Sequence, residues 1–523
     1  MNFLDSLKRE TNYTHTENGA SALKSTLNYC LDAFGSLGAM RNSSEEDIIE
    51  TFSKAFFADR ELAMKMLFYM RDIRGGQGAR RVFRVIARWL VDTNPEYILN
   101  NLNNFLEYGR GDDILCLLDT EIERNVCMWA YCQIKADLMS MHKNEPCSLL
   151  AKWLPSENAS SAQTKSYARV IIHHWGASSV DYRRILSKLR AYIDVVERKM
   201  SANDWKSINY EAVPSKASLK YTNAFFTHDQ KGYVNYLKAV ANKDAKVNAG
   251  ALFPVDIVHK VFENRNISQK DRILYDAMWN ALPNYCADKD ETGICVVDTS
   301  GSMSGQPIEV AISLGMYCAD KCRGPFKNHF ITFSRNPQLQ EVRGTDIVEK
   351  VRNLEKANWD MNTNLEAVFD LILTTAKRHN LSQEDMPKKL YIISDMQFDA
   401  ARNCSNDCFG YRIGYRTKPA TFMESMSRKY KAAGYEMPVI VYWNVRASKC
   451  GMFQQTFEGR QCCMVSGYSP SLFKSIIEGT TYEEYETKDE NGKTVKAIRE
   501  KVDPIDVMLA TLNSERYAKV WVG

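Results

Sequence analysis

The segment Ile294-Cys-Val-Val-Asp-Thr-Ser-Gly-Ser-Met-Ser-Gly305 carries an apolar run directly into a cluster of polar side chains. Four apolar residues ahead of Asp298 predict a buried strand that presents oxygen atoms at its carboxyl end. Gly301 and Gly305 let the backbone turn back tightly before the helix that Pro307 predicts. Ligands of open α/β sheets bind just outside the carboxyl ends of the strands, so this turn is a predicted binding site.

The turn offers one carboxylate, that of Asp298, and the hydroxyls of Ser300 and Ser302. Hard oxygen atoms of this kind suit a hard divalent cation, and the turn therefore predicts a site for Mg²⁺ or Mn²⁺. The alternative is that these side chains only shape a turn and cap a helix.

The pattern Asp-x-Ser-x-Ser after an apolar strand resembles the metal-ion-dependent adhesion site of von Willebrand factor A domains. That site takes two further residues downstream, and both have counterparts here. Thr363 precedes a helix-like run, and Asp395 ends a second apolar strand. The resemblance implies a metal held by three hydroxyls and, directly or through water, by two carboxylates: Ser300, Ser302, Thr363, Asp298 and Asp395.

The composition is that of a globular chain: 523 residues, 45% hydrophobic and 25% charged, predict two or more domains. A net charge of +4 means that any nucleic-acid surface is a local patch, and no DNA specificity is expected. There is no signal-like start and no apolar run of about 18 residues, so we expect a cytoplasmic protein without membrane contact. The fourteen cysteines are scattered, which favours reduced core thiols over disulfides.

The chain is predicted to divide into a flexible arm (1–17), a helical-repeat domain (18–286) and a doubly wound α/β domain (287–523). Residues 18–286 show apolar residues at three-four spacing, which favours a HEAT-like α-solenoid, a fold that can close into a ring, over an irregular helical domain. The expected helices include Glu45–Phe57, Arg60–Arg71, Ala79–Val91, Ile122–Met141, Ser166–Trp175 and Tyr182–Met200.

The second domain alternates apolar strands with amphipathic helices, which predicts a mainly parallel sheet. A charged stretch, Tyr482–Lys496, predicts a hairpin or loop, and Asp503–Val520 predicts a closing helix. The expected strands are Gly293–Asp298, Asn328–Ser334, Lys389–Asp395, Val439–Val445 and Cys462–Ser466.

Three parts of the helical region are basic. A glycine turn, Gly75–Gly78, is surrounded by arginines, and we expect its N–H groups and the forked arginine donors to hold phosphate or sugar oxygens. Each basic part, taken singly, also fits a solvated helix face. The candidate RNA-binding residues are Arg71, Arg74, Arg80, Arg81, Arg84, Arg183, Arg184, Lys188 and Lys216.

Five short motifs mark the same region: Phe68-Tyr-Met-Arg-Asp-Ile-Arg-Gly-Gly-Gln-Gly-Ala-Arg-Arg81, Tyr108-Gly-Arg-Gly-Asp-Asp113, Ala151-Lys-Trp-Leu-Pro155, Tyr182-Arg-Arg184 with Leu189-Arg190, and Ile208-Asn-Tyr-Glu-Ala-Val-Pro-Ser-Lys216. They resemble proteins related to the Ro autoantigen, in which a TROVE-type helical-repeat module precedes a von Willebrand factor A domain. The resemblance implies a ribonucleoprotein scaffold that binds small non-coding or misfolded RNA. It also implies a metal-bearing domain that recruits a protein carboxylate.

Catalysis is not predicted. Gly301-Ser-Met-Ser-Gly305 has the glycine spacing of a nucleophile elbow, but its central residue is Met303. The open alternative to an RNA scaffold is therefore another binding protein, an adaptor whose solenoid holds a peptide or a helix and no RNA.

Overall fold

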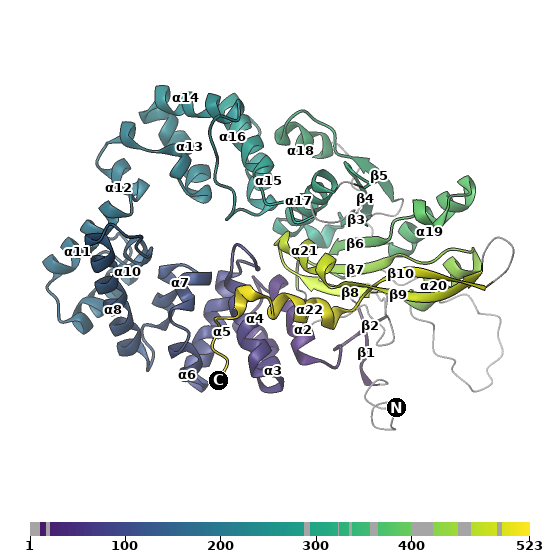
Figure 1. Cartoon of the computed structure of the whole chain (residues 1–523), viewed down its shortest axis with the longest axis horizontal. Helices are drawn as coiled ribbons and strands as arrows, with labels where there is room; N and C mark the ends of the chain where they lie inside the picture. The colour runs from purple at the N-terminus through teal and green to yellow at the C-terminus, as the bar shows by residue number, and fades with distance from the viewer. Residues whose placement is uncertain are drawn as a thin grey trace. The chain divides into compact units, whose positions relative to one another are not determined.

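The computed structural model describes residues 11–16, 21–286, 293–322, 324–333, 337–355, 364–398, 422–447, 462–488 and 494–523 (Figure 1). The chain combines a mainly helical N-terminal region with a C-terminal mixed sheet, as predicted. It forms two compact units that are not continuous in sequence. The sheet unit comprises Met1–Ser43, Phe253–Ile267 and Pro283–Thr511, and the helical unit comprises Ser44–Leu252, Ser268–Leu282 and Leu512–Gly523.

The sheet unit is built on six strands in the order β5-β4-β3-β6-β7-β8. They are parallel except β5, which pairs with β4 in the antiparallel sense. The strand order reverses between β3 and β6, as in a doubly wound sheet. The strands are β3 (Gly293–Asp298), β4 (His329–Phe333), β5 (Gln338–Glu341), β6 (Lys389–Ser394), β7 (Val439–Asn444) and β8 (Cys462–Ser466).

Helices cover both faces of this sheet, because its strands are apolar on both sides. On one face α17 (Gln306–Lys321) approaches so closely that a Cβ at Gly315 would lie 2.5 Å from Val297 Cγ2. On the opposite face Val296 belongs to a core that includes Phe369 of α19 (Leu365–His379). The same core contains Tyr430 of α20 (Phe422–Ala432).

The N-terminal segment belongs to the sheet unit, which differs from the predicted boundary at residue 18. Ser466 Oγ in edge strand β8 donates to Phe34 O (3.0 Å) and accepts from Gly38 N (3.1 Å). Thr16, in the predicted flexible arm, donates to Phe398 O (2.7 Å). The other elements of this unit are β1 (Tyr13–His15), β2 (Ser21–Leu23), α2 (Tyr29–Ser36), α15 (Pro254–Glu263), α18 (Ile347–Glu355), α21 (Ser471–Glu478), β9 (Thr480–Lys488), β10 (Thr494–Val502) and α22 (Pro504–Leu512).

In the helical unit, helices pack mainly on their neighbours in sequence (Figure 1). Helix α3 shows why they form, since Ser44 caps its N-terminus and its buried residues recur at three-four spacing. The helices are α3 (Glu45–Ala58), α4 (Arg60–Arg71), α5 (Arg80–Thr93), α6 (Pro95–Leu99), α7 (Asn104–Tyr108), α8 (Glu123–His142), α9 (Leu150–Trp153), α10 (Ala162–Trp175), α11 (Ser179–Tyr192), α12 (Val196–Ser201), α13 (Ser215–His228), α14 (Gln230–Ala241) and α16 (Gln269–Asn280).

The predicted single helix Tyr182–Met200 is wrong: the chain forms α11 and α12 with a break between them. Asp194 has a φ of +51°, a left-handed conformation that interrupts a helix. Lys199 Nζ donates to Asp194 Oδ2 (2.8 Å) and holds the break. Apolar spacing continues across the break, which is why the pattern alone indicated one helix.

The predicted closing helix Asp503–Val520 is also shorter, because α22 ends at Leu512 and the residues that follow join the helical unit. There they meet the buried carboxylate of Asp72, which is 1% exposed. Arg516 Nη2 donates to Asp72 Oδ1 (2.8 Å) and Tyr517 OH to Asp72 Oδ2 (3.2 Å). Tyr108 OH donates to Arg516 O (2.6 Å), so the segment is fixed at several points.

Two further predictions concern the whole chain. Within the described residues, no helix has the length and apolarity that crossing a bilayer requires. The cysteines of these residues are free thiols and most of them are buried, in agreement with the predicted reduced core thiols.

Replacing Arg516 with Met should destabilise the helical unit, because the buried Asp72 carboxylate loses its charged partner. Breaking a buried ion pair costs about 3–5 kcal/mol, and the partial exposure of Arg516 places the expected loss nearer ~2 kcal/mol. Urea unfolding followed by circular dichroism measures it. The control Lys54→Met breaks the exposed pair with Glu50 and should cost less than about 1 kcal/mol. Equal losses in the two variants would contradict the role given to Asp72.

Candidate functional sites

The predicted oxygen cluster lies at the carboxyl ends of β3 and β6, where the strand order reverses. Asp298 is the last residue of β3, and Asp395 directly follows β6. The two strands are parallel neighbours with Val297 paired to Ile393, so both carboxylates lie at the same edge of the sheet. Ligands of doubly wound sheets bind at this point.

The Asp298 side chain is fully buried and accepts two hydrogen bonds. Ser300 N donates to Asp298 Oδ1 (2.9 Å), and Ser394 Oγ donates to Oδ2 (2.5 Å). Burial raises the pKa of Asp298 to about 6; the hydrogen bonds oppose this shift, and the negative charge of Asp395 adds to it. A cation bound at this edge would stabilise the ionised form of both carboxylates.

The predicted hydroxyl ligands of the turn lie together, with Ser300 Oγ and Ser302 Oγ 3.0 Å apart. Arg446, which follows β7, donates from its guanidinium to Ser302 O. Asp395 Oδ1 accepts from Gln397 N (3.2 Å), which fixes the loop after β6. The structure therefore gathers two carboxylates and two hydroxyls around one strand edge.

This donor set suits a hard cation. The fifth predicted ligand, Thr363, lies outside the described residues. Among the residues that are described, no group of three or more His, Cys, Asp or Glu side chains is arranged to hold a metal. A metal at this edge depends on hydroxyl and water ligands beside the carboxylates, which is coordination that Mg²⁺ accepts.

A second cluster, in the helical unit, surrounds the buried carboxylate of Asp113. Arg71 Nε donates to Asp113 Oδ2 (2.6 Å), and Arg84 Nε donates to Oδ1 (2.8 Å). Arg71 is only 4% exposed, so its guanidinium serves this internal network and does not face solvent. Arg80 lies further out, with 44% of its side chain exposed and Nη1 3.4 Å from Asp112 Oδ2.

The N–H groups of Gly75, Gln77 and Gly78, in the turn between α4 and α5, bond within the protein, contrary to the expectation that they would hold an anion. Gly75 N donates to Asp72 Oδ2 (3.1 Å), and Gly78 N donates to Asp72 O (2.9 Å). A Cβ at Gly76 would lie 2.0 Å from Tyr69 O, so only glycine fits there. The turn positions the arginines around it.

The other predicted RNA-binding side chains are exposed. Arg183 Nε donates to Ser179 O (3.2 Å), and Arg184 Nη1 lies 3.7 Å from Asp181 Oδ1, both at the surface of α11. The exposed residues of the predicted set are Arg74, Arg80, Arg81, Arg183, Arg184, Lys188 and Lys216.

Arg110 connects the cluster around Asp113 to α9 and α11. Its Nε and Nη2 donate to the two oxygens of Asp112 (2.8 and 2.5 Å), and its guanidinium carbon lies 4.0 Å from the centroid of the Trp153 ring. Trp153 ends α9, which packs against α11. Sequence reasoning did not single out Arg110 or Trp153, although both lie in the short motifs Tyr108–Asp113 and Ala151–Pro155.

Two family models match the chain, and both are described as domains of unknown function. The DUF2828 model matches residues 16–110 and 156–284, and the DUF7788 model matches residues 292–512. Neither is a TROVE or von Willebrand factor A model. A relative from Acanthamoeba polyphaga mimivirus, uncharacterized protein L728, is 30% identical over 508 residues, which cover 90% of this chain and 86% of the viral protein.

The raised pKa of Asp298 predicts a pH-dependent stability in EDTA. An aspartate has a pKa near ~3.9 when unfolded, so the folded chain holds more protons between about pH 4 and pH 6 and the free energy of unfolding falls as pH rises through this window. The loss in the free energy of unfolding that comes from ionising the buried Asp298 is complete above pH 6 and amounts to at most ~3 kcal/mol. Asp298→Asn should therefore be more stable than the wild type at pH 7, with the gain disappearing toward pH 4.

Thermal melts across pH measure this difference. Asp506→Asn, which removes an exposed carboxylate on α22, should leave the pH profile nearly unchanged. A gain in Asp298→Asn that is the same at every pH would show that burial of the charge is not its cause.

Proposed function

The chain belongs to the same family as the mimivirus protein L728, and we propose that it is an RNA-binding scaffold for small structured or misfolded RNA, similar in kind to Ro proteins. In this proposal the helical unit binds the RNA. The sheet unit binds Mg²⁺ or Mn²⁺ at Asp298, Ser300, Ser302 and Asp395, and the metal recruits a protein partner through a carboxylate.

The observation that carries the proposal is the series of basic side chains that runs from α5 through Arg110 and Trp153 to α11. Arginines offer forked donors that match phosphate oxygens, and aromatic rings stack on unpaired bases. Ion pairs with Asp112 hold Arg80 and Arg110 in place, which lowers the entropy lost when a ligand binds. With a net charge of only +4, RNA affinity has to arise from such a local surface.

The arrangement of the helices gives further support. Helices that pack on their sequence neighbours are typical of helical repeats, which present extended surfaces to large ligands. The breaks between them, such as that at Asp194, place short loops and helix ends at the surface.

The sheet unit supports the second part of the proposal. An antiparallel edge strand on an otherwise parallel sheet, with serine and aspartate oxygens at the reversal of strand order, agrees with a von Willebrand factor A arrangement. A cation held by two carboxylates and neutral oxygens keeps free coordination positions, which a carboxylate from a partner protein can fill.

Arginine substitution should weaken RNA binding and reduce its salt dependence. In Arg74→Gln/Arg80→Gln/Arg81→Gln, three exposed charges are lost while Arg71 and Arg84 still neutralise Asp113. Each lost phosphate contact should reduce the slope of log K against log salt by about 0.7 to 0.9. Filter binding of a labelled stem–loop RNA with a single-stranded tail, over a salt series, measures both quantities.

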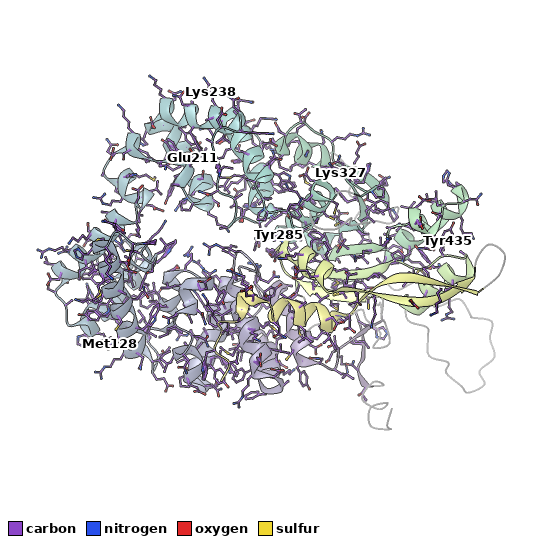
Figure 2. The ribbon with its side chains drawn as sticks, in the orientation of Figure 1. Met128, Glu211, Lys238, Tyr285, Lys327 and Tyr435 are labelled. Carbon is purple, nitrogen blue, oxygen red and sulfur yellow. The ribbon has the colours of Figure 1, made fainter. Side chains whose placement is uncertain are left out.

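The matched control removes three exposed lysines elsewhere in the helical unit, including Lys238 on α14 (Figure 2): Lys54→Gln/Lys231→Gln/Lys238→Gln. It should bind RNA as the wild type does. Affinity and slope that are unchanged in a folded arginine variant would reject this surface. An absence of RNA binding together with salt-insensitive capture of an apolar peptide would favour the adaptor alternative.

Divalent cations should raise the melting temperature of the wild type, because a ligand that binds only the folded state stabilises it. Asp298→Ala should remove most of this rise, since it deletes the central carboxylate of the cluster. Differential scanning fluorimetry with Mg²⁺ or Mn²⁺ against EDTA measures the metal-dependent difference, with the exposed Asp506→Ala as control. An undiminished rise in Asp298→Ala would place the cation elsewhere.

A further inference from the structure

Four cysteines of the sheet unit lie close together where α17 packs on β3 (Figure 1). Cys286 precedes β3, Cys295 lies within it, Cys318 is in the last turn of α17, and Cys322 directly follows that helix. At most 3% of each residue is exposed. The four thiols are therefore a buried cluster that the predicted oxygen cluster does not include.

The thiols of this cluster contact one another in a row. Cys318 Sγ lies 3.4 Å from Cys322 Sγ, which is hydrogen-bonding distance for two sulfur atoms. Cys318 also hydrogen-bonds with Cys295, and Cys322 with Cys286. Zinc requires four ligands around one centre, and no set of cysteine, histidine or acidic side chains in the described ranges is arranged in this way. The row favours chemistry between two thiols over a zinc site.

Tyr317 of α17 holds the segment that carries Cys286. Its hydroxyl donates to Pro283 O (2.5 Å) and accepts from Tyr285 N (3.0 Å). Both hydrogen bonds are made by the backbone just before Cys286, so this cysteine is kept at the end of the helix. The cluster thus joins parts of the chain that are fixed against one another.

Cys318 and Cys322 are placed for a disulfide. Cys322 N donates to Cys318 O (2.9 Å), and Cys322 itself has an extended backbone (φ −67°, ψ 149°) outside the helix. Residues four apart at a helix end have Cα atoms roughly 6 Å apart, within the range of about 4.4 to 6.8 Å that disulfides span. The sulfur atoms have to approach to about 2.05 Å, which small rotations of two side chains provide.

The sulfur of Cys322 is the nucleophile of this pair. Hydrogen bonds with Cys286 and Cys318 lower the pKa of Cys322, the buried ammonium of Lys389 adds to this, and burial opposes it. Hydrogen bonds with Cys295 and Cys322, together with burial, raise the pKa of Cys318. A thiolate therefore lies in contact with a protonated thiol.

We propose that Cys318 and Cys322 are a redox-active pair, which hydrogen peroxide converts to a disulfide. The Cys322 thiolate attacks one peroxide oxygen, the O–O bond breaks, and a sulfenic acid and a hydroxide ion form. Cys318 then attacks the Cys322 sulfur and displaces a second hydroxide, and one of the two hydroxides takes the Cys318 proton to give water. The two sulfur atoms lose two electrons, which the peroxide gains. This chemistry does not depend on the proposed RNA binding.

Peptide mapping by mass spectrometry tests the pair. The full chain is treated with hydrogen peroxide, denatured, blocked with N-ethylmaleimide, and cut with trypsin and an aspartate-specific protease. Cleavage before Asp298 and after Lys321 leaves Cys295, Cys318 and Cys322 on separate peptides. We expect a linked pair of the Cys318 and Cys322 peptides, which dithiothreitol separates.

Serine variants distinguish the two roles, because serine keeps a hydrogen-bond donor. In Cys286→Ser/Cys318→Ser, the sulfenic acid on Cys322 has lost both neighbouring thiols and should be trapped by dimedone. In Cys322→Ser, Cys318 should stay unmodified. The matched control Cys132→Ser, which removes an exposed thiol of the helical unit, should form the disulfide as the wild type does. Melting curves confirm that each variant is folded.

Two groups of thiols in the same chain calibrate the oxidant. Peroxide is raised until the exposed Cys132 is oxidised, while Cys462 and Cys463, buried in β8 with pKa values that burial raises, should stay reduced. The linked pair together with the trapped sulfenic acid supports the proposal. A disulfide between other cysteines, equal oxidation of Cys462 and Cys463, or a reduced Cys318 and Cys322 after Cys132 has been oxidised overturns it.

Discussion

The carboxylate of Asp72 determines how the helical unit is assembled. A buried negative charge requires donors on every side, and here they come from the glycine turn after α4 and from the C-terminal segment with Arg516 and Tyr517. Burial and the charge of Asp72 together raise the pKa of Tyr517, which keeps its hydroxyl a donor. Because this carboxylate fixes the turn, the exposed arginines on either side of it project from a rigid backbone.

The adjacent carboxylates Asp112 and Asp113 bind different sets of arginines. Those bound by Asp113 are more buried than those bound by Asp112. Asp113 pairs with Arg71 and Arg84, while its neighbour Asp112 holds Arg80 and Arg110 in partly exposed positions. Four arginines against two aspartates leave a local excess of positive charge whose side chains are held in place. The same acidic pair therefore serves both stability and the proposed recognition of RNA.

Much of the sheet could be predicted because apolar runs and the turns after them mark strand ends, and the strands Gly293–Asp298 and Cys462–Ser466 agree with prediction. Strand β5 was not predicted from the sequence, because it is short, polar and mostly exposed at the edge of the sheet. The turn that follows Asp298 was predicted from its place after an apolar strand, whereas Asp395 was implied only by the resemblance to von Willebrand factor A domains. The roles of the arginines could not be predicted, because the sequence does not show whether Arg71 faces solvent or binds the buried Asp113.

The chain passes from one unit to the other five times, at residues 43/44, 252/253, 267/268, 282/283 and 511/512. Asp72 is therefore synthesised long before Arg516, its partner in the helical unit. Until Arg516 has been synthesised, the helical unit lacks the guanidinium that pairs with the carboxylate of Asp72.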